Sequence, residues 1–228
     1  MPIKAIAKKI IQKLGYNVTK HKQIQVLRGL DLPIKVMPNC KLLPNRDAAL
    51  ALLPKGGIVA EVGVAYGDFS RKIIDTIHPE KFYAVDSYGL GPGDDLWGTQ
   101  ILTSSKMRHE EFIKNKFKNE IEQKIFIIKK GFSWDVLETF EDNYFDYVYL
   151  DAGHDYDSVK KDVTVLYKKL KNNGIIQFND YCLFDWIENV PLGIIRAVDE
   201  LLVNSNHEIL YYCLQKEGFH DIVVKLNK

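Results

Sequence analysis

From about residue 55 the chain alternates short apolar runs with amphipathic segments, and this alternation constrains the fold most strongly. Strands are expected at residues 57–62, 81–86, 125–129, 145–151 and 174–179, and helices at residues 68–77, 104–121, 133–140, 156–170 and 192–203. Strands that alternate with helices are typical of a parallel sheet covered on both faces. The sequence therefore predicts an α/β fold with a doubly wound, mostly parallel sheet.

Both ends of the chain depart from this pattern. Residues 208–214 and 220–226 resemble two strands joined by a glycine-containing turn, so one antiparallel strand of a C-terminal hairpin is expected at a sheet edge. The apolar residues of segment 3–14 follow the spacing of one helix face. We therefore expect residues 1–53 to form a basic N-terminal helix and a cap segment, and residues 54–228 to form the main domain.

Composition excludes several classes of protein. The chain has 228 residues, 46% hydrophobic and 11% aromatic, which is enough to collapse around a core and excludes disorder. No apolar run approaches the ~18 residues of a membrane-spanning helix. Cys40, Cys182 and Cys213 are widely spaced and odd in number, which argues against disulfides and zinc. A reducing, cytoplasmic location is expected.

The net charge of +1 conceals an asymmetry between the two parts of the chain. Residues 1–46 hold ten Lys or Arg and one acid, a charge of +9, which leaves −8 for residues 47–228. The basic segment can complement the acidic body, lie on a membrane, or attract an anionic substrate or partner. It is also a candidate contact in a homodimer.

A glycine turn follows the first strand of the main domain. It runs from Glu61 through Gly63 and Gly67 to Ser70, and two glycines four residues apart let the backbone approach a ligand closely. Asp86 ends the second strand and can accept hydrogen bonds from a ribose diol. In an open parallel sheet, ligands bind beyond these strand ends, so the turn and the acid together indicate an adenosine-type cofactor.

Two positions of the turn distinguish between possible adenosine cofactors, because they lack the glycines of dinucleotide-binding proteins. Ala65 and Asp68 stand at the second and third positions of the G-x-G-x-x-G fingerprint, and an aspartate there would repel a pyrophosphate. An acidic rim suits the positive charges of S-adenosylmethionine instead. The glycine turn, with Val85, Asp86 and Ser87, resembles the cofactor motifs of class I S-adenosylmethionine-dependent methyltransferases.

This resemblance covers about residues 55–226 and implies a Rossmann-like fold with the reversed terminal hairpin. It implies that Glu61, Gly63, Tyr66, Gly67 and Ser70 shape the methionine pocket beside Asp151. It also implies that Asp86 and Ser87 lie at the ribose, and that Phe132 and Ser133 border the adenine.

Oxygen-bearing side chains end the fourth and fifth strands of the main domain. Asp151 ends the fourth, and Asn179 and Asp180 end the fifth, so neighbouring strands would bring all three together. Such an all-oxygen set suits Mg²⁺. The sequence around these residues is similar to that of macrocin-type sugar and small-molecule O-methyltransferases, in which the implied metal ligands map to Asp151, Asn179 and Asp180. Two adjacent acids are usual there, and this chain has Asn-Asp.

Methyl transfer to a hydroxyl also requires a proton acceptor. Asp151 and His154 are the candidate catalytic residues, because both would lie beside the acceptor oxygen. Alternatively, Asp151 caps the following turn and His154 bonds local backbone. The loop at residues 89–98, with Tyr88 and Trp97, is expected to form a substrate lid, and Phe184 and Trp186 line the opposite wall or serve packing.

The predicted function is therefore Mg²⁺-assisted O-methylation of a small molecule or sugar. The alternatives are a metal-independent N- or carboxyl-methyltransferase and a non-catalytic S-adenosylmethionine-binding protein. A nucleic-acid substrate is not favoured, because Asn179, Asp180 and Tyr181 lack the prolines of base-methylation motifs and the body is acidic.

Overall fold

The structure is a computed structural model that describes residues 25–228. The predicted N-terminal helix at residues 3–14 lies outside the described residues. Of the predicted cap segment at residues 1–53, only residues 25–53 are described.

One eight-stranded sheet forms the centre of the molecule, in the order β1-β9-β10-β6-β5-β2-β3-β4. Its strands are β1 (Lys41–Leu43), β2 (Ile58–Val62), β3 (Lys81–Asp86), β4 (Phe126–Lys130), β5 (Phe145–Leu150), β6 (Leu170–Phe178), β9 (Glu208–Cys213) and β10 (Asp221–Lys225). Only β10 runs antiparallel, between β6 and β9. The predicted mostly parallel α/β sheet is confirmed.

The expected edge position of the antiparallel strand is wrong. β10 lies inside the sheet, and the outermost strand is β1, which pairs with β9 in parallel. β1 has three residues and follows prolines, so its sequence carries no strand periodicity, and only its pairing with β9 identifies it as a strand.

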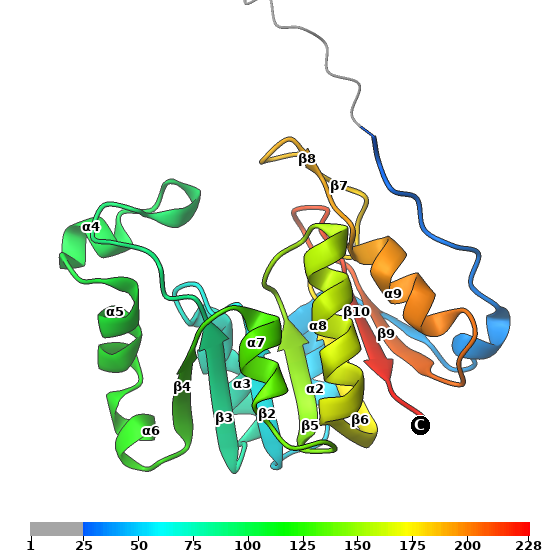
Figure 1. The fold of residues 1–228 in the computed structure, drawn as a ribbon, viewed down its shortest axis with the longest axis horizontal. Coiled ribbons are helices and arrows are strands. Elements are labelled where there is room, and N and C mark those ends of the chain that lie inside the picture. Colours follow the sequence, from blue (N-terminus) through cyan, green and yellow to red (C-terminus); the bar gives the residue numbers. More distant parts are fainter. Residues whose placement is uncertain (1–24) are drawn as a thin grey trace, which may run out of the picture.

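Helices cover both faces of the sheet (Figure 1). One face carries α7 (Ser133–Glu138), α8 (Tyr156–Lys169) and α9 (Ile194–Leu202), and the other carries α2 (Arg46–Leu52), α3 (Asp68–Ile77) and α5 (His109–Lys116). Each face buries its own apolar cluster against the sheet. Among residues 25–228, no helix is long and apolar enough to cross a membrane.

The helix starts follow from local sequence. The α3 helix begins after Gly67, whose φ of +69° is left-handed, and it buries Phe69, Ile73 and Ile77 at helical spacing. Asp155 caps α8, because its side chain accepts a hydrogen bond from the Ser158 N–H at 3.1 Å. Both helices start at the end of the sheet where β2 and β5 finish.

The predicted single helix at residues 104–121 is wrong. The chain forms three short helices there, α4 (Ile101–Ser105), α5 and α6 (Lys118–Glu122). Lys106 has a φ of +56°, which ends α4 and turns the chain before α5 begins. The first two residues of the predicted helix therefore belong to α4, and its remaining helical turns belong to α5 and α6.

Two segments project beyond the carboxyl ends of the parallel strands (Figure 1). The first runs from Tyr88 to α4 and includes the short 3₁₀ helix η2 (Leu96–Gly98). The second is a small hairpin of β7 (Phe184–Asp185) and β8 (Val190–Pro191), which sequence periodicity did not indicate because each strand has two residues. These segments flank the strand ends on opposite sides.

Candidate active site

Backbone hydrogen bonds tie the strand ends into one continuous rim. The Gly63 N–H donates to the Val85 carbonyl at 2.8 Å, and the Asp151 N–H donates to the Val62 carbonyl at 2.7 Å. The Asn179 N–H donates to the Leu150 carbonyl at 3.0 Å. The residues that follow β2, β3, β5 and β6 therefore hold fixed positions relative to one another.

The glycine turn is packed so closely that a side chain would not fit at its two glycines. Gly63 has a φ of +91°, and a Cβ placed there would lie 1.8 Å from the Asp151 carbonyl oxygen. A Cβ at Gly67 would lie 2.6 Å from the Phe117 ring. The first glycine thus lets the turn pack against the backbone at the end of β5.

Glu61 and Ser70 lie beneath this turn. Both are buried, and the Ser70 hydroxyl donates a hydrogen bond to the Glu61 carboxyl group. Burial raises the pKa of Glu61 well above its usual range, although the Ser70 hydrogen bond opposes this effect. The pair joins α3 to β2, so it shapes the turn from inside the protein.

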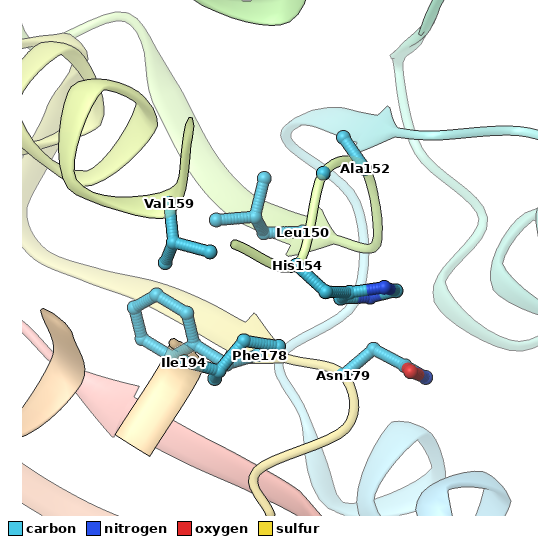
Figure 2. Close-up of a pocket in the computed structure, with 8 residues that line it drawn as sticks. Leu150, Ala152, His154, Val159, Phe178, Asn179 and Ile194 are labelled. Atoms are coloured by element: carbon cyan, nitrogen blue, oxygen red, sulfur yellow. The ribbon is translucent and has the colours of Figure 1, made fainter. Parts of the chain in front are cut away.

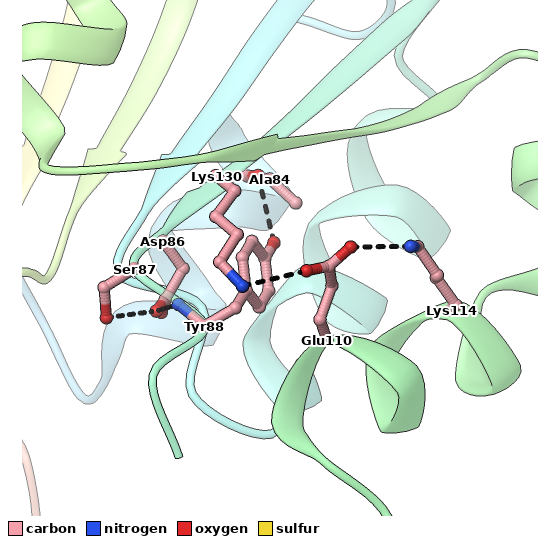
Figure 3. Close-up of polar contacts among 7 residues, drawn as sticks. All are labelled: Ala84, Asp86, Ser87, Tyr88, Glu110, Lys114 and Lys130. Carbon is pink, nitrogen blue, oxygen red and sulfur yellow. Dashed lines mark hydrogen bonds and ion pairs between the residues drawn. The ribbon is translucent and has the colours of Figure 1, made fainter. Parts of the chain in front are cut away.

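Asp86 holds the turn from the neighbouring strand, and Figure 3 shows its contacts with Ser87 and Tyr88. Its carboxylate accepts hydrogen bonds at 2.8 Å from the Val64 N–H and from the Tyr88 N–H, and a longer one, at 3.3 Å, from the Ser87 hydroxyl. The Ala65 N–H is a fourth donor, at 3.4 Å. A carboxylate offers about four lone-pair positions, so Asp86 orders the turn, and a ribose hydroxyl would replace one of the two long bonds.

Tyr66 links the glycine turn to the projecting loop. Its hydroxyl accepts hydrogen bonds from the Leu96 N–H at 2.5 Å and from the Thr99 hydroxyl at 3.0 Å. Its ring meets the edge of Trp97 at 6.0 Å between centroids, and Trp97 is 70% exposed. The loop predicted as a lid is therefore anchored on a residue of the turn.

Two aromatic residues line other parts of the rim. Gly131 donates its N–H to the Asp86 carbonyl at 3.0 Å, which places Phe132 beside the end of β3, followed by Ser133 at the start of α7. Phe132 is 63% exposed and stacks on Trp134. Trp186, between β7 and β8, is also exposed and stacks on Phe219, whereas Phe184 is half-buried.

Asp151, His154 and Asp180 meet where β5 and β6 end. The His154 Nε2 atom lies 3.3 Å from Asp151 Oδ1 and 3.9 Å from Asp180 Oδ2. It is buried and has no hydrogen-bond partner among the described residues. In the narrow pocket of Figure 2, His154 and Asn179 point to the same side. The predicted convergence of the two strand ends is confirmed.

Electrostatics couples these three groups. Burial and the charge of Asp151 raise the pKa of Asp180 to about 7, against the opposing effect of His154. Burial disfavours the charged imidazole, but Asp151 and Asp180 outweigh it, so the pKa of His154 lies above its usual value. The Asp180 carboxyl group therefore holds or releases a proton near neutral pH.

Sequence reasoning missed Arg46 and Tyr149. The Tyr149 hydroxyl accepts hydrogen bonds from Arg46 Nη1 at 2.7 Å and from Asn179 Nδ2 at 3.0 Å. Tyr149 resembles an ordinary core residue of an apolar strand, and Arg46 stands in the segment before the main domain. Neither position carries a local motif, so only the tertiary contact reveals them.

The donor set for a metal ion consists of oxygens. Asp151 and Asp180 bring two carboxylates close together, and Asn179 has a side-chain oxygen that is not used in its bond to Tyr149. This chemistry fits Mg²⁺. Within residues 25–228, however, no group of three or more His, Cys, Asp or Glu side chains is arranged to hold a metal ion.

The comparison with protein families decides the identity of the domain. Residues 60–181, more than half of the chain, match the family model described as "Methyltransferase domain". The chain belongs to this methyltransferase family. The match begins at β2 and ends after Asp180, so it contains the glycine turn, Asp86, and the group of Asp151, His154 and Asp180.

Solved structures show the same fold in other methyltransferases. An O-methyltransferase from Bacillus cereus, in complex with S-adenosylhomocysteine, has a TM-score of 0.54 at 12% identity over 84% of each chain. A precorrin-6y C5,15-methyltransferase from Geobacter metallireducens has a TM-score of 0.52 at 12% identity, over 80% of this chain and 85% of that one. An rRNA methylase from Streptococcus thermophilus has a TM-score of 0.53 at 10% identity, over 80% and 95%.

The family and the fold confirm the expectation of a class I, S-adenosylmethionine-dependent methyltransferase. The neighbours act on different kinds of acceptor, so the fold by itself does not define the acceptor. A search of curated proteins found no match. The roles of individual residues, the metal ion and the acceptor remain predictions.

Proposed function

We propose that this methyltransferase transfers the methyl group of S-adenosylmethionine to a hydroxyl of a small molecule such as a sugar. The observation that carries the proposal is the meeting of Asp151, His154 and Asp180 beside the glycine turn, with the His154 Nε2 atom 3.3 Å from Asp151 Oδ1 and 3.9 Å from Asp180 Oδ2. Removing the hydroxyl proton is what O-methylation requires of the protein beyond alignment of the reactants.

In this proposal, the cofactor lies along the strand ends. The turn from Gly63 to Gly67 holds the methionine part, Asp86 and Ser87 hold the ribose, and Phe132 and Ser133 border the adenine. Support comes from the tight contact of Gly63 with Asp151 and from the exposed ring of Phe132 beside the end of β3.

The proton leaves the acceptor toward Asp151 and His154. The buried, unpartnered Nε2 atom of His154 is available to a proton at this site, and Asp151 stabilises the imidazolium that forms. A sulfonium bound nearby adds positive charge, which favours the neutral imidazole before reaction. His154 therefore acts as the proton acceptor and Asp151 as its electrostatic partner.

Asp151, Asn179 and Asp180 would also hold Mg²⁺. A bound Mg²⁺ supplies charge that lowers the pKa of an acceptor hydroxyl and orients its oxygen. The two carboxylates beside one neutral amide oxygen support this assignment. We expect activity on hydroxylated acceptors to fall when a chelator is added and to return when Mg²⁺ is restored.

The binding step is tested first by titration calorimetry with S-adenosylhomocysteine, the expected product. Dissociation constants in the micromolar range, ~−8 kcal/mol, or tighter would support the proposal. Methyl transfer to a panel of hydroxyl, amine and carboxyl acceptors then separates the reaction classes. Preference for amine or carboxyl acceptors would favour the metal-independent alternative, and binding without turnover on any acceptor would favour a non-catalytic role.

The catalytic assignment predicts that His154→Gln lowers kcat about 10²- to 10⁴-fold, the usual contribution of general acid–base catalysis, and leaves the affinity for S-adenosylhomocysteine nearly unchanged. A matched control is His78→Asn, at the exposed C-terminal cap of α3, where the left-handed φ of +52° suits asparagine. An equal loss of kcat and of affinity in His154→Gln would contradict the assignment.

A further inference from the structure

Arg46 stands at the start of α2 and is held rigidly between aromatic side chains. Its guanidinium lies 4.6 Å from the centroid of the Phe69 ring and 6.0 Å from that of Tyr149. Nη1 donates to the Tyr149 hydroxyl at 2.7 Å. Phe69 belongs to the first turn of α3, so Arg46 lies directly beside the glycine turn.

Most hydrogen-bond donors of this guanidinium are not used. The bond to Tyr149 is the one side-chain hydrogen bond that Arg46 makes within the described part of the chain, and Asp221 and Asp151 act on it only from a distance, without an ion pair among residues 25–228. Arginine has five N–H donors. An arginine so fixed, with free donors and no ion-pair partner, is typical of a site that receives an anion.

The charge of Arg46 is secure. Burial opposes it, but Tyr149, Asp221 and Asp151 keep the pKa of the guanidinium above its usual value. The nearby acids lie too far away to form an ion pair, yet they prevent loss of the proton. The strand ends thus carry one fixed cation beside a group of acids.

The methyl donor of the proposed function matches this pattern of charges. S-adenosylmethionine carries an ammonium and a sulfonium, which suit the acids, and one anionic group, the methionine carboxylate. The methionine part is expected over the turn after β2, where α3 begins, and this is where the guanidinium of Arg46 contacts Phe69.

We infer that Arg46 binds the methionine carboxylate of the cofactor, and this inference rests on the proposed function. The arginine comes from α2, before the region that matches the methyltransferase family model, so the family match does not assign it. The other cation near the turn, Lys116, already donates to the Tyr66 carbonyl at 2.7 Å and pairs with Asp68.

The test compares two ligands that differ in the carboxylate. Titration calorimetry on the full chain uses S-adenosylhomocysteine and its decarboxylated analogue, S-adenosyl-3-thiopropylamine, which keeps the amine. We expect Arg46→Met to weaken S-adenosylhomocysteine binding about 10- to 100-fold, the size of a charge-assisted hydrogen bond. Affinity for the analogue should change less than about twofold, because the analogue has no group for Arg46 to bind.

Two further variants separate binding from packing. Arg46→Lys keeps the charge and should lose less affinity than Arg46→Met. Arg71→Met is the matched control, because Arg71 also stacks on a phenylalanine, Phe117, at 4.7 Å, but has an ion-pair partner, Glu120, at 2.5 Å. This control should not discriminate between the two ligands.

Each remaining outcome overturns a distinct claim. Equal weakening of both ligands in Arg46→Met, or unfolding of Arg46→Met with no ligand discrimination in Arg46→Lys, would make Arg46 a packing residue. Unchanged binding of S-adenosylhomocysteine with a raised KM for the acceptor would place an acceptor anion at Arg46. Failure of the unaltered chain to bind S-adenosylhomocysteine would overturn the proposed function, and this inference with it.

Discussion

A row of buried polar side chains crosses the sheet below Tyr149. The Tyr147 hydroxyl donates to Gln177 Oε1 at 3.0 Å, and Gln177 Nε2 donates to Asp221 at 2.7 Å. Gln215 donates to the other oxygen of Asp221 at 3.0 Å. Each member is satisfied by its neighbour, so the row costs little although it is buried. It joins β5, β6 and β10 with the turn after β9.

The buried carboxyl group of Asp221 should make the stability of the protein depend on pH. Burial raises its pKa from 3.8 to about 6 in the folded protein, despite the Gln177 hydrogen bond, and the unfolded chain keeps the ordinary value. The folded state therefore binds the proton more tightly, so stability falls as pH rises from about 4 to 6. The expected loss over this window is about 2 kcal/mol.

Asp221→Asn removes this titration. The free energy of unfolding, measured by urea denaturation, should fall by about 2 kcal/mol between pH 4 and pH 6.5 in the unaltered protein relative to the variant. Asp185→Asn serves as the control, because this half-buried carboxylate at the end of β7 accepts hydrogen bonds from the Ile187 and Glu188 N–H groups and lies outside the Gln177–Asp221 network. Parallel pH curves for the unaltered protein and Asp221→Asn would show that Asp221 does not titrate in this window.

The loop that follows β3 is attached to the site through few contacts. The Tyr66 hydroxyl and the His109 N–H, which donates to the Leu90 carbonyl at 3.1 Å, attach the segment to its surroundings. Within the segment, Asp95 ties the loop to α4 by accepting hydrogen bonds from the Leu102 N–H at 2.6 Å and from Thr103. Trp97 has a left-handed φ of +53° and an exposed ring. A segment with few buried contacts opens more easily than the sheet, as a substrate lid requires.

Tyr66→Phe should loosen this lid and leave the fold intact. It removes the acceptor for Leu96 and Thr99, so limited proteolysis within residues 90–106 should become several-fold faster, and the KM for the acceptor should rise. Tyr156→Phe is the control, because that hydroxyl donates to Glu200 between α8 and α9. Unchanged proteolysis in Tyr66→Phe would indicate that the other contacts of the segment hold the lid without help.

At the scale of the whole molecule, one sheet connects both apolar clusters. The cluster under α8 and α9 and the cluster under α2 and α3 share the strands β2, β3, β5 and β6. If the strands of the sheet come apart, both clusters lose the surface against which they pack. We therefore expect the main domain to unfold in a single cooperative transition.

A ligand at the strand ends should stabilise this single unit. S-adenosylhomocysteine at 100 times its dissociation constant adds about 2.7 kcal/mol, which for a chain of this size raises the Tm by about 5–10 °C. Scanning calorimetry measures the shift. NAD is the control, since Asp68 at the start of α3 opposes a pyrophosphate. A shift with NAD, or two separate transitions, would contradict this view.

Local signals in the chain predicted the order of elements, the glycine turn and the acids at the strand ends. Apolar runs and helical spacing act over a few residues, and parallel neighbours must end at the same side of a sheet. For that reason the meeting of Asp151 with Asp180 was predictable once β5 and β6 were taken as neighbours, and the structure confirms it.

Long-range contacts alone decided the remaining features. The inner position of β10, the edge strand β1 and the break at Lys106 depend on pairing and packing partners far away in the chain. Arg46 bonds to Tyr149, which is 103 positions away in the chain, and stacks on Phe69 in the first turn of α3. The sequence by itself determined the fold class and the methyltransferase motifs, because these follow from periodicity and turn chemistry. The tertiary structure decided which charges face one another, because that depends on how separate elements pack.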